Sequence, residues 1–227
     1  MTPPTSAATV FGDRLPLAER LANWLTGPGI TRGLLGPREA ELIWERHLLN
    51  GVDIAPLIPS GSVVVDLGSG AGLPGLPLLL ARPDLHLVLV EPKQRRVDFL
   101  EEVCADLALP ARVVRARATA GGLILLPEGA EGSELPAADV VTARAVAPLA
   151  ELGRWAAALL RPGGRLLAVK GASADEELDR DRAVLEGLGF QAAEVLHFAA
   201  VGDRAGTAPQ LTTTVIAVMW GDVSRET

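Results

Sequence analysis

The chain has 227 residues, 48% of them hydrophobic, which suffices for a sizeable core and excludes both an intrinsically disordered chain and a small disulfide-stapled one. Its 28 acidic and 21 basic side chains give a net charge of −7, which excludes a uniformly cationic surface but allows a local basic patch. A single cysteine, Cys104, excludes an internal disulfide, and the chain starts without the basic-then-apolar order of a signal peptide, so we expect a cytoplasmic protein.

The first part of the chain has helical patterns. Residues 1–12 are small and polar, and we expect a frayed tail there. Apolar side chains then recur at the spacing of an amphipathic helix, at Leu17, Leu21, Trp24 and Leu25. This helix is predicted to stop at residues 27–29, Gly-Pro-Gly, and a second is predicted over PREAELIWERHLLNG. We therefore expect residues 13–58 to form an N-terminal helical cap on a domain of residues 59–227.

From residue 59, short apolar runs alternate with helical stretches. The runs that predict strands are SVVVDL, HLVLVEP, ARVVRAR, ADVVTAR and GRLLAVKG. The longest apolar run, LPGLPLLLA, is too short to cross a bilayer, so we expect no membrane partner. AGGLILLPEGAEGSELPAA reads as a loop with a short insertion, and the β-rich segments QAAEVLHFAAV and LTTTVIAVMW predict a closing hairpin.

These elements predict the fold class. Alternating strands and helices indicate a parallel α/β sheet. With the hairpin, we expect a seven-stranded, mostly parallel sheet that ends in an antiparallel hairpin. This is the Rossmann-like architecture of class I S-adenosylmethionine-dependent methyltransferases, and residues 59–227 are the predicted methyltransferase domain.

The strongest local signal is the loop VVVDLGSGAGLPG. Asp66 ends a strand, and Gly68, Gly70 and Gly72 follow at alternate positions, where glycine allows positive φ and close approach of a ligand. Glu91 ends the next strand, where a carboxylate can accept both hydroxyls of a ribose. The glycines also fit a dinucleotide site, but an acid just before them suits a cationic sulfonium and would repel a pyrophosphate. We therefore predict S-adenosyl-L-methionine as the cofactor rather than NAD.

The residue types in the sequence narrow the range of methyl acceptors. Methylation at pyrimidine C5 requires a thiol nucleophile, but Cys104 lies on an apolar helical stripe, where a packed core cysteine is expected. TARAVAP stands where adenine methyltransferases have a polar-Pro-Pro-aromatic motif, and His47, His86 and His197 lack metal-ligand spacing, so we expect no metal. What remains is an acceptor with a free lone pair, such as guanine N7, which needs no general base.

Basic side chains follow several predicted strands, at the edge where open α/β sheets bind ligands. We expect them, with two residues of the second cap helix, to contact RNA phosphates. The predicted RNA-binding residues are Arg46, His47, Lys93, Arg95, Arg96, Arg115, Arg117 and Lys170. Arg144 and Lys170, which end the fourth and fifth strands, are also the predicted catalytic residues. The low aromatic content, 4%, argues against a base-stacking platform.

Five motifs together resemble one family, the bacterial 16S ribosomal RNA guanine-N7 methyltransferases, called RsmG or glucose-inhibited division protein B. They are LLGPREAELIWERHLLN, VVDLGSGAGLPGLPLLLARP, EPKQRRVDFL, TARAVAPL and LLAVKG. The resemblance implies methylation of a guanine in the 530 loop of small-subunit RNA, with 16S rRNA or an assembling subunit as partner. It also implies cofactor contacts at Gly68, Leu73, Glu91 and Arg144. We expect the protein to act as a monomer.

The chain departs from this family after the third strand. Relatives commonly read Arg-Ala-Glu there, whereas this chain has Thr119 in place of the acid. A hydroxyl replaces one hydrogen bond but not a charged acceptor, so we expect the backbone of Ala118 and Thr119 to contact the adenine. This departure keeps open a methyltransferase-like RNA-binding protein without turnover. A small-molecule methyltransferase is the other alternative.

Overall fold

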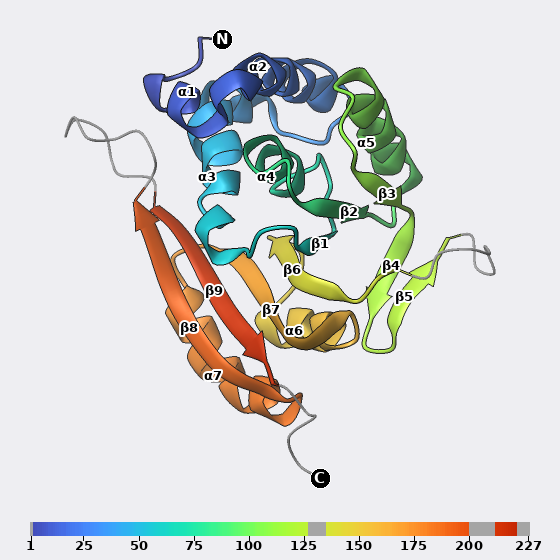
Figure 1. The fold of residues 1–227 in the computed structure, drawn as a ribbon, viewed down its shortest axis with the longest axis vertical. Helices are drawn as coiled ribbons and strands as arrows, with labels where there is room; N and C mark the ends of the chain where they lie inside the picture. Colours follow the sequence, from blue (N-terminus) through green and yellow to red (C-terminus); the bar gives the residue numbers. More distant parts are fainter. Residues whose placement is uncertain (1, 127–134, 200–211, 222–227) are drawn as a thin grey trace.

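The computed structural model describes residues 2–126, 135–199 and 212–221 of the chain (Figure 1). In these residues one sheet contains seven strands. They are β1 (Val63–Leu67), β2 (His86–Val90), β3 (Arg112–Val114), β6 (Ala138–Arg144), β7 (Leu160–Lys170), β8 (Phe190–Ala199) and β9 (Thr212–Trp220). Their order in the sheet is β3-β2-β1-β6-β7-β9-β8. None of the helices described is long and apolar enough to span a membrane.

The connections of the sheet diverge between β1 and β6. Strand β1 pairs in parallel with β2 on one side and with β6 on the other, so the chain winds in opposite directions from this point. Strand β7 continues the parallel part, and β9 lies antiparallel to both β7 and β8. The predicted mostly parallel sheet with a closing antiparallel hairpin is confirmed. The connection at residues 200–211 lies outside the described part of the chain.

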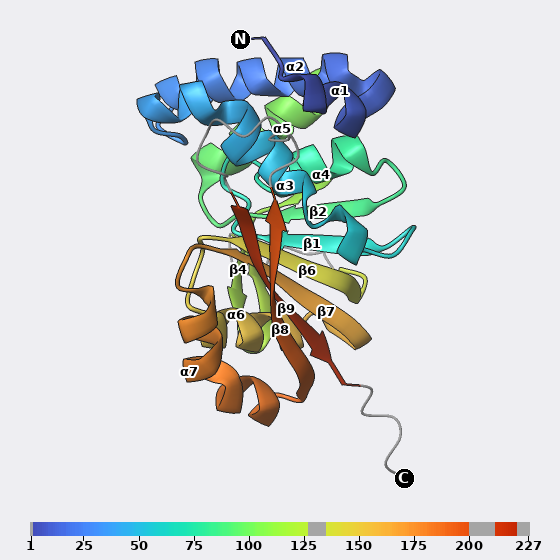
Figure 2. The same ribbon diagram turned by 90° about the vertical axis from the view of Figure 1, so that its left-hand side faces the viewer.

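Helices cover both faces of the sheet, which explains why its strands are continuous apolar runs. One face carries α4 (Gly75–Ala81), α5 (Gln94–Asp106) and the N-terminal helices, and the other carries α6 (Leu149–Ala157) and α7 (Ala174–Gly187) (Figure 2). Successive strand residues alternate between the two cores: Val64 packs in the first, and Val65 in the second.

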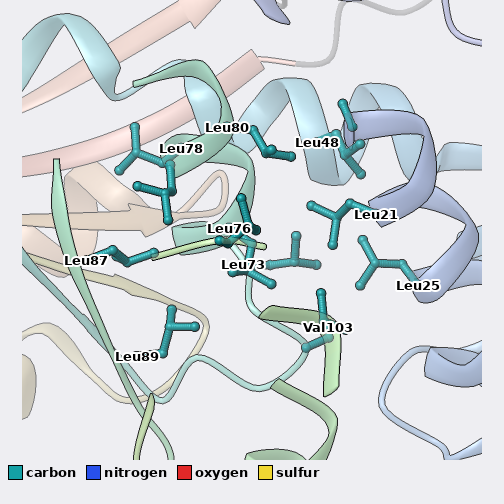
Figure 3. Close-up of a cluster of buried hydrophobic side chains, with 14 of the residues drawn as sticks. Leu21, Leu25, Leu48, Leu73, Leu76, Leu78, Leu80, Leu87, Leu89 and Val103 are labelled. Atoms are coloured by element: carbon teal, nitrogen blue, oxygen red, sulfur yellow. The ribbon is translucent and has the colours of Figure 1, made fainter. Parts of the chain in front are cut away.

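The N-terminal layer is more extensive than predicted. It comprises α1 (Thr5–Phe11), η1 (Gly12–Arg14), α2 (Leu15–Trp24), η2 (Leu25–Gly29), η3 (Pro37–Leu42), η4 (Ile43–Leu49), α3 (Asn50–Val52) and η5 (Ala55–Leu57). Leucines of this layer meet those of α4 in one cluster, where Figure 3 shows Leu21, Leu25 and Leu48 beside Leu76 and Leu80. The predicted stop at residues 27–29 is wrong, because η2 is a π-helix that carries Pro28 within it and leads into Ile30.

The prediction of a frayed tail over residues 1–12 is also wrong. Thr5–Phe11 is helical, and Ala7 and Phe11 are buried at 0% and 4% exposure. The Phe11 ring meets the Trp44 ring edge-on, with centroids 6.5 Å apart. The segment is short and rich in small side chains, but its buried Ala7 and Phe11 dock it on the second helical stretch.

The third predicted strand, ARVVRAR, is two strands. Only β3 joins the main sheet, while β4 (Ala116–Thr119) pairs antiparallel with β5 (Gly122–Leu125) in a separate small sheet. The predicted loop AGGLILLPEGAEGSELPAA therefore begins with a strand, whose Leu123 packs against the second core. Residues 127–134 of that loop lie outside the described part of the chain. The hairpin matters for the site because it brings Ala118 and Thr119 beside the ends of β1 and β2.

Packing of α1 predicts the effect of truncating Phe11. Phe11→Ala removes a buried ring and should lower the free energy of unfolding by about 3 kcal/mol. Chemical denaturation followed by circular dichroism measures this, with Thr9→Ala, an exposed position on the same helix, as the matched control. Equal stability of Phe11→Ala and Thr9→Ala would show that the segment is not docked.

Candidate functional site

A cavity of about 1110 Å³ opens at the carboxyl ends of β1, β2 and β6. Its floor is the glycine loop that follows β1, and its walls are the segments after β2 and β6 and the turn of the β4–β5 hairpin. Leu34 and Leu35 of the N-terminal layer close one side. The cavity thus lies where the strand connections diverge, which is the usual ligand position in open α/β sheets.

The glycine loop adopts the predicted backbone conformation. Gly68, Gly70 and Gly72 all have positive φ, between +59° and +88°. A Cβ at Gly68 would lie 2.8 Å from the Val146 side chain, and one at Gly72 would lie 2.3 Å from Leu76. Gly68, Gly70 and Leu73 line the cavity, but Gly72 does not. The predicted ligand contact of Gly72 is therefore corrected: this glycine allows the loop to pack on α4.

Glu91 stands at the cavity with its carboxylate already oriented. The residue is 1% exposed, and its two oxygens accept hydrogen bonds from the backbone N–H groups of Gly70, at 3.1 Å, and Lys93, at 3.0 Å. Arg96 Nη1 lies 3.5 Å from the same carboxylate. Each carboxylate oxygen keeps further acceptor capacity, so Glu91 can still accept hydroxyl groups from a ligand in the cavity.

Asp66 lies beneath the loop rather than in the cavity wall. It is 0% exposed, its Oδ1 accepts a hydrogen bond from Thr142 Oγ1 at 2.9 Å, and its Oδ2 has no hydrogen-bond partner within the described structure. Burial raises its pKa from 3.8 to about 6, against the opposing effects of Thr142, Ser69 and the backbone N–H of Gly75. Asp66, predicted as a cofactor-binding residue, therefore does not line the cavity, and we expect it to act on a ligand there through its charge.

Arg144 reaches the cavity from the end of β6, as predicted. Its Nη2 lies 2.5 Å from His47 Nδ1, and its Nη1 donates to the Arg46 carbonyl oxygen at 3.3 Å. His47 Nε2 in turn lies 2.6 Å from Glu39 Oε2. His47 is only 4% exposed, so its predicted contact with RNA is corrected: the ring lies between two charged side chains and does not face solvent.

Lys170 does not line the cavity among the described residues. Its Nζ donates to the Ala147 carbonyl oxygen and to Glu177 Oε1, both at 2.9 Å, and its side chain is 10% exposed. The predicted direct role of Lys170 in catalysis and RNA binding does not fit this position, because its ammonium group is bonded to Ala147 and Glu177. Lys170 instead fixes the segment between β6 and α6, which carries Val146 and Pro148 into the cavity wall.

The remaining predicted residues divide between the cavity and its surroundings. Lys93, Arg96, Arg117, Ala118 and Thr119 line it. The Thr119 hydroxyl donates to the Gly122 carbonyl oxygen at 2.9 Å, so it stabilises the hairpin turn. Three others stand outside the lining: exposed Arg95 on α5, Arg115 whose Nε donates to the Pro92 carbonyl oxygen at 3.5 Å, and Arg46, which pairs with Glu39.

Sequence reasoning missed one wall of the cavity. Glu151, Arg154 and Trp155 project from α6, in positions that helical spacing of three and four residues places on one face. The segment belongs to a helical stretch between two predicted strands, but none of its residues forms a recognisable motif. Spacing alone therefore cannot indicate which helix face meets a cavity.

Cys104 is buried in the first core, and burial raises the pKa of its thiol to about 11. The prediction of a packed, unreactive cysteine is confirmed. Within residues 2–126, 135–199 and 212–221, no three His, Cys, Asp or Glu side chains gather as a metal site requires.

Residues 14–205 match the model of a protein family, GidB, described as rRNA small subunit methyltransferase G. Ribosomal RNA small subunit methyltransferase G of Salinispora tropica is 54% identical over 202 residues, covering 86% of this chain and 81% of that protein. The protein of the same name from Mycobacterium sp. (strain KMS) is 48% identical over 196 residues, covering 86% and 84%.

Solved structures of methyltransferases share the fold. The S-adenosylmethionine-dependent methyltransferase SibL in its apo form has a TM-score of 0.56 at 15% identity, covering 94% of this chain and 74% of that one. A methyltransferase from Pyrococcus furiosus has a TM-score of 0.53 at 16% identity, covering 90% and 99%. These similarities confirm the predicted Rossmann-like methyltransferase fold.

The burial of Asp66 predicts that removing its charge increases the stability of the fold, by an amount that depends on pH. A pKa of about 6 in the fold, against 3.8 ordinarily, means that the charged form costs up to about 3 kcal/mol above pH 6 and nothing below about pH 4. Asp66→Asn should therefore raise the melting temperature at neutral pH, with the gain vanishing toward pH 4. Thermal denaturation across this range measures it.

Asp84 provides a control of opposite sign for this experiment. Hydrogen bonds from Arg82, Gly61 and Ser60 hold the Asp84 pKa below its ordinary value. Its charged form stabilises the fold, so Asp84→Asn should lower the melting temperature at neutral pH, with the loss disappearing in acid. If Asp66→Asn behaved like Asp84→Asn, the burial of an unpaired charge at Asp66 would be refuted.

Proposed function

We propose the reaction of this chain on the premise that it belongs to the rRNA small subunit methyltransferase G family, GidB, which its match over residues 14–205 establishes. This membership confirms the resemblance seen in the motifs. The chain is an S-adenosyl-L-methionine-dependent methyltransferase of small-subunit ribosomal RNA. We further propose that it methylates N7 of a guanine in the 530 loop of 16S rRNA, in the cytoplasm and as a monomer.

The residues of the cavity fit the cofactor. We assign its binding to Gly68, Gly70, Leu73, Glu91, Ala118, Thr119 and Arg144, all of which line the cavity. Glu91 is held by two backbone N–H groups and retains acceptor capacity for the ribose hydroxyls. The unpartnered Oδ2 of Asp66 below the loop supplies the negative field that a cation needs. When bound, the cofactor supplies a methyl group on a positively charged sulfur.

Methyl transfer to guanine N7 requires few catalytic groups from the protein. N7 carries a lone pair and no proton, so no general base is required and the chain's task is to orient the base and exclude water. The buried Cys104 thiol, with its raised pKa, is unsuited to a covalent route. The wall formed by Glu151, Arg154 and Trp155 offers polar and aromatic groups, and we assign the holding of the target base to it.

Free cations surround the mouth of the cavity. The structure places Lys93 and Arg117 in its lining and Arg95 on the adjoining helix, and none of these side chains forms an ion pair within the described residues. Elsewhere, arginines are neutralised by acids, as in the pairs Arg20–Asp106, Arg32–Glu102 and Arg82–Asp84. A chain with net charge −7 thus presents positive charge where an RNA phosphate backbone would lie.

Mapping of the methyl mark tests this function. Purified protein, cofactor and small subunits lacking the 530-loop methyl group should yield one N7-methylguanine, located by mass mapping of rRNA fragments. Naked 16S rRNA and a panel of small-molecule acceptors run in parallel. Transfer to a small molecule alone would favour the first alternative, and cofactor binding without transfer to any acceptor would favour a non-catalytic RNA-binding protein.

The cations Lys93 and Arg117, which line the cavity, predict how salt affects RNA binding. Each of Lys93→Gln and Arg117→Gln should weaken binding and reduce the slope of log K against log salt by about 0.7 to 0.9, because each removes one phosphate contact. Fluorescence anisotropy with a 530-loop RNA measures the slope. Arg112→Gln is the matched control: Arg112 is exposed but begins β3, at the end of the strand opposite the cavity. A slope altered equally by all three would contradict a defined RNA face.

A further inference from the structure

A line of hydrogen bonds joins the N-terminal layer to the cavity wall. Glu39 of η3 contacts His47 of η4 at 2.6 Å, and His47 contacts Arg144, 97 residues away at the end of β6, at 2.5 Å. Glu39 is partly exposed, His47 is buried, and Arg144 lines the cavity. The line therefore runs from the surface, through a buried imidazole, to a guanidinium at the site.

The partners of His47 determine where its proton must be. A guanidinium has donors only, so the Arg144 contact requires a lone pair on His47 Nδ1. The single ring proton must then lie on Nε2, which donates it to the Glu39 carboxylate. A doubly protonated ring cannot accept from Arg144. The observed geometry is consequently that of a neutral imidazole.

The charges around His47 favour this neutral form. Burial and the positive charge of Arg144 lower the pKa of His47, and Arg46 on its own helix acts in the same direction. Glu39, facing the ring from η3, opposes them. Burial lowers the pKa of Arg144 itself, and the negative charge of Asp66 opposes that shift. Protonating His47 would thus add a positive charge next to a buried guanidinium.

We propose that His47 is a positioning residue for methyl transfer: the neutral ring holds the Arg144 guanidinium against the cavity wall, and protonation of the ring releases it. This inference rests on the proposed function of the cavity. It replaces the direct RNA contact expected for His47 with an action through Arg144. It also makes the activity of the site depend on pH through a residue that never touches substrate.

Two substitutions separate the contacts of the ring. Asn places its Oδ1 where His47 has Nδ1, so His47→Asn retains an acceptor for Arg144 but does not reach Glu39. His47→Phe removes both contacts while filling the site. We expect kcat to fall about 10-fold to 100-fold in His47→Phe, with largely restored kcat in His47→Asn. His197→Asn, at a half-exposed histidine on β8, is the matched control.

The pH profile distinguishes positioning from folding. Between about pH 5.5 and 8.5, activity of the unmodified protein should fall in acid as the ring is protonated. His47→Asn should lose the part of that acid limb that His47 contributes, because Asn does not titrate, whereas the part that Asp66 contributes with its pKa of about 6 remains and is measured separately in Asp66→Asn. His47→Phe and Arg144→Met should give a double variant no slower than Arg144→Met alone. Melting temperatures measured alongside identify any variant that fails to fold. An unchanged acid limb in His47→Asn, or additive effects, would overturn the proposal.

An NMR titration tests the same contact without turnover. The chain has three histidines, so three imidazole signals can be assigned. Arg144→Met removes the neighbouring positive charge and should raise the His47 pKa while leaving that of His197 unchanged. An unmoved His47 pKa would overturn the inference even in active protein. Conversely, a shifted His47 pKa in protein that transfers no methyl group would support the contact while the proposed function fails.

Discussion

The hydrogen bond from Thr142 to the buried carboxylate of Asp66 joins β1 to β6 at the place where the chain connections of the sheet diverge. These residues are register partners and stand at the ends of their strands, so the bond closes the sheet directly beneath the glycine loop. An acid with one unpartnered oxygen in a fully buried position costs stability. The fold tolerates that cost at a functional position, where a charged ligand can offset it.

The N-terminal layer is part of the site and not merely a cover. Trp24 Nε1 donates to Asp106 Oδ2 of α5 at 2.8 Å, and Asn50 Nδ2 donates to Thr213 Oγ1 of β9 at 2.5 Å. The layer thus bonds to helix α5 on one face of the sheet and to strand β9 within it. Because it also carries His47, which orients Arg144, loosening the layer would disturb the cavity without altering any residue that lines it. Its leucines pack in the same core as α4, which makes this coupling direct.

Local sequence patterns predicted the sheet because its strands are continuous apolar runs, and they predicted the loop because positive φ demands glycine at Gly68. Local patterns do not predict contacts between segments that are distant in the sequence. His47 and Lys170 are basic residues whose type suggests RNA, but Arg144 and Glu177 occupy them in the fold. The docking of α1 escaped prediction for a similar reason: burial of Phe11 depends on Trp44, which local periodicity does not include.

The arrangement of Arg144 explains how a cationic cofactor can share a site with a buried guanidinium. Within the described residues, Arg144 is held by the His47 ring and the Arg46 carbonyl oxygen, and it makes no ion pair with Asp66. Both of its partners are uncharged, so they fix the guanidinium without consuming a carboxylate. Asp66 therefore keeps its charge for the cavity. An ion pair between Asp66 and Arg144 would neutralise that field, and a cationic ligand would have to break it before binding. Neutral support for Arg144 is thus the condition for a negative floor beneath the loop.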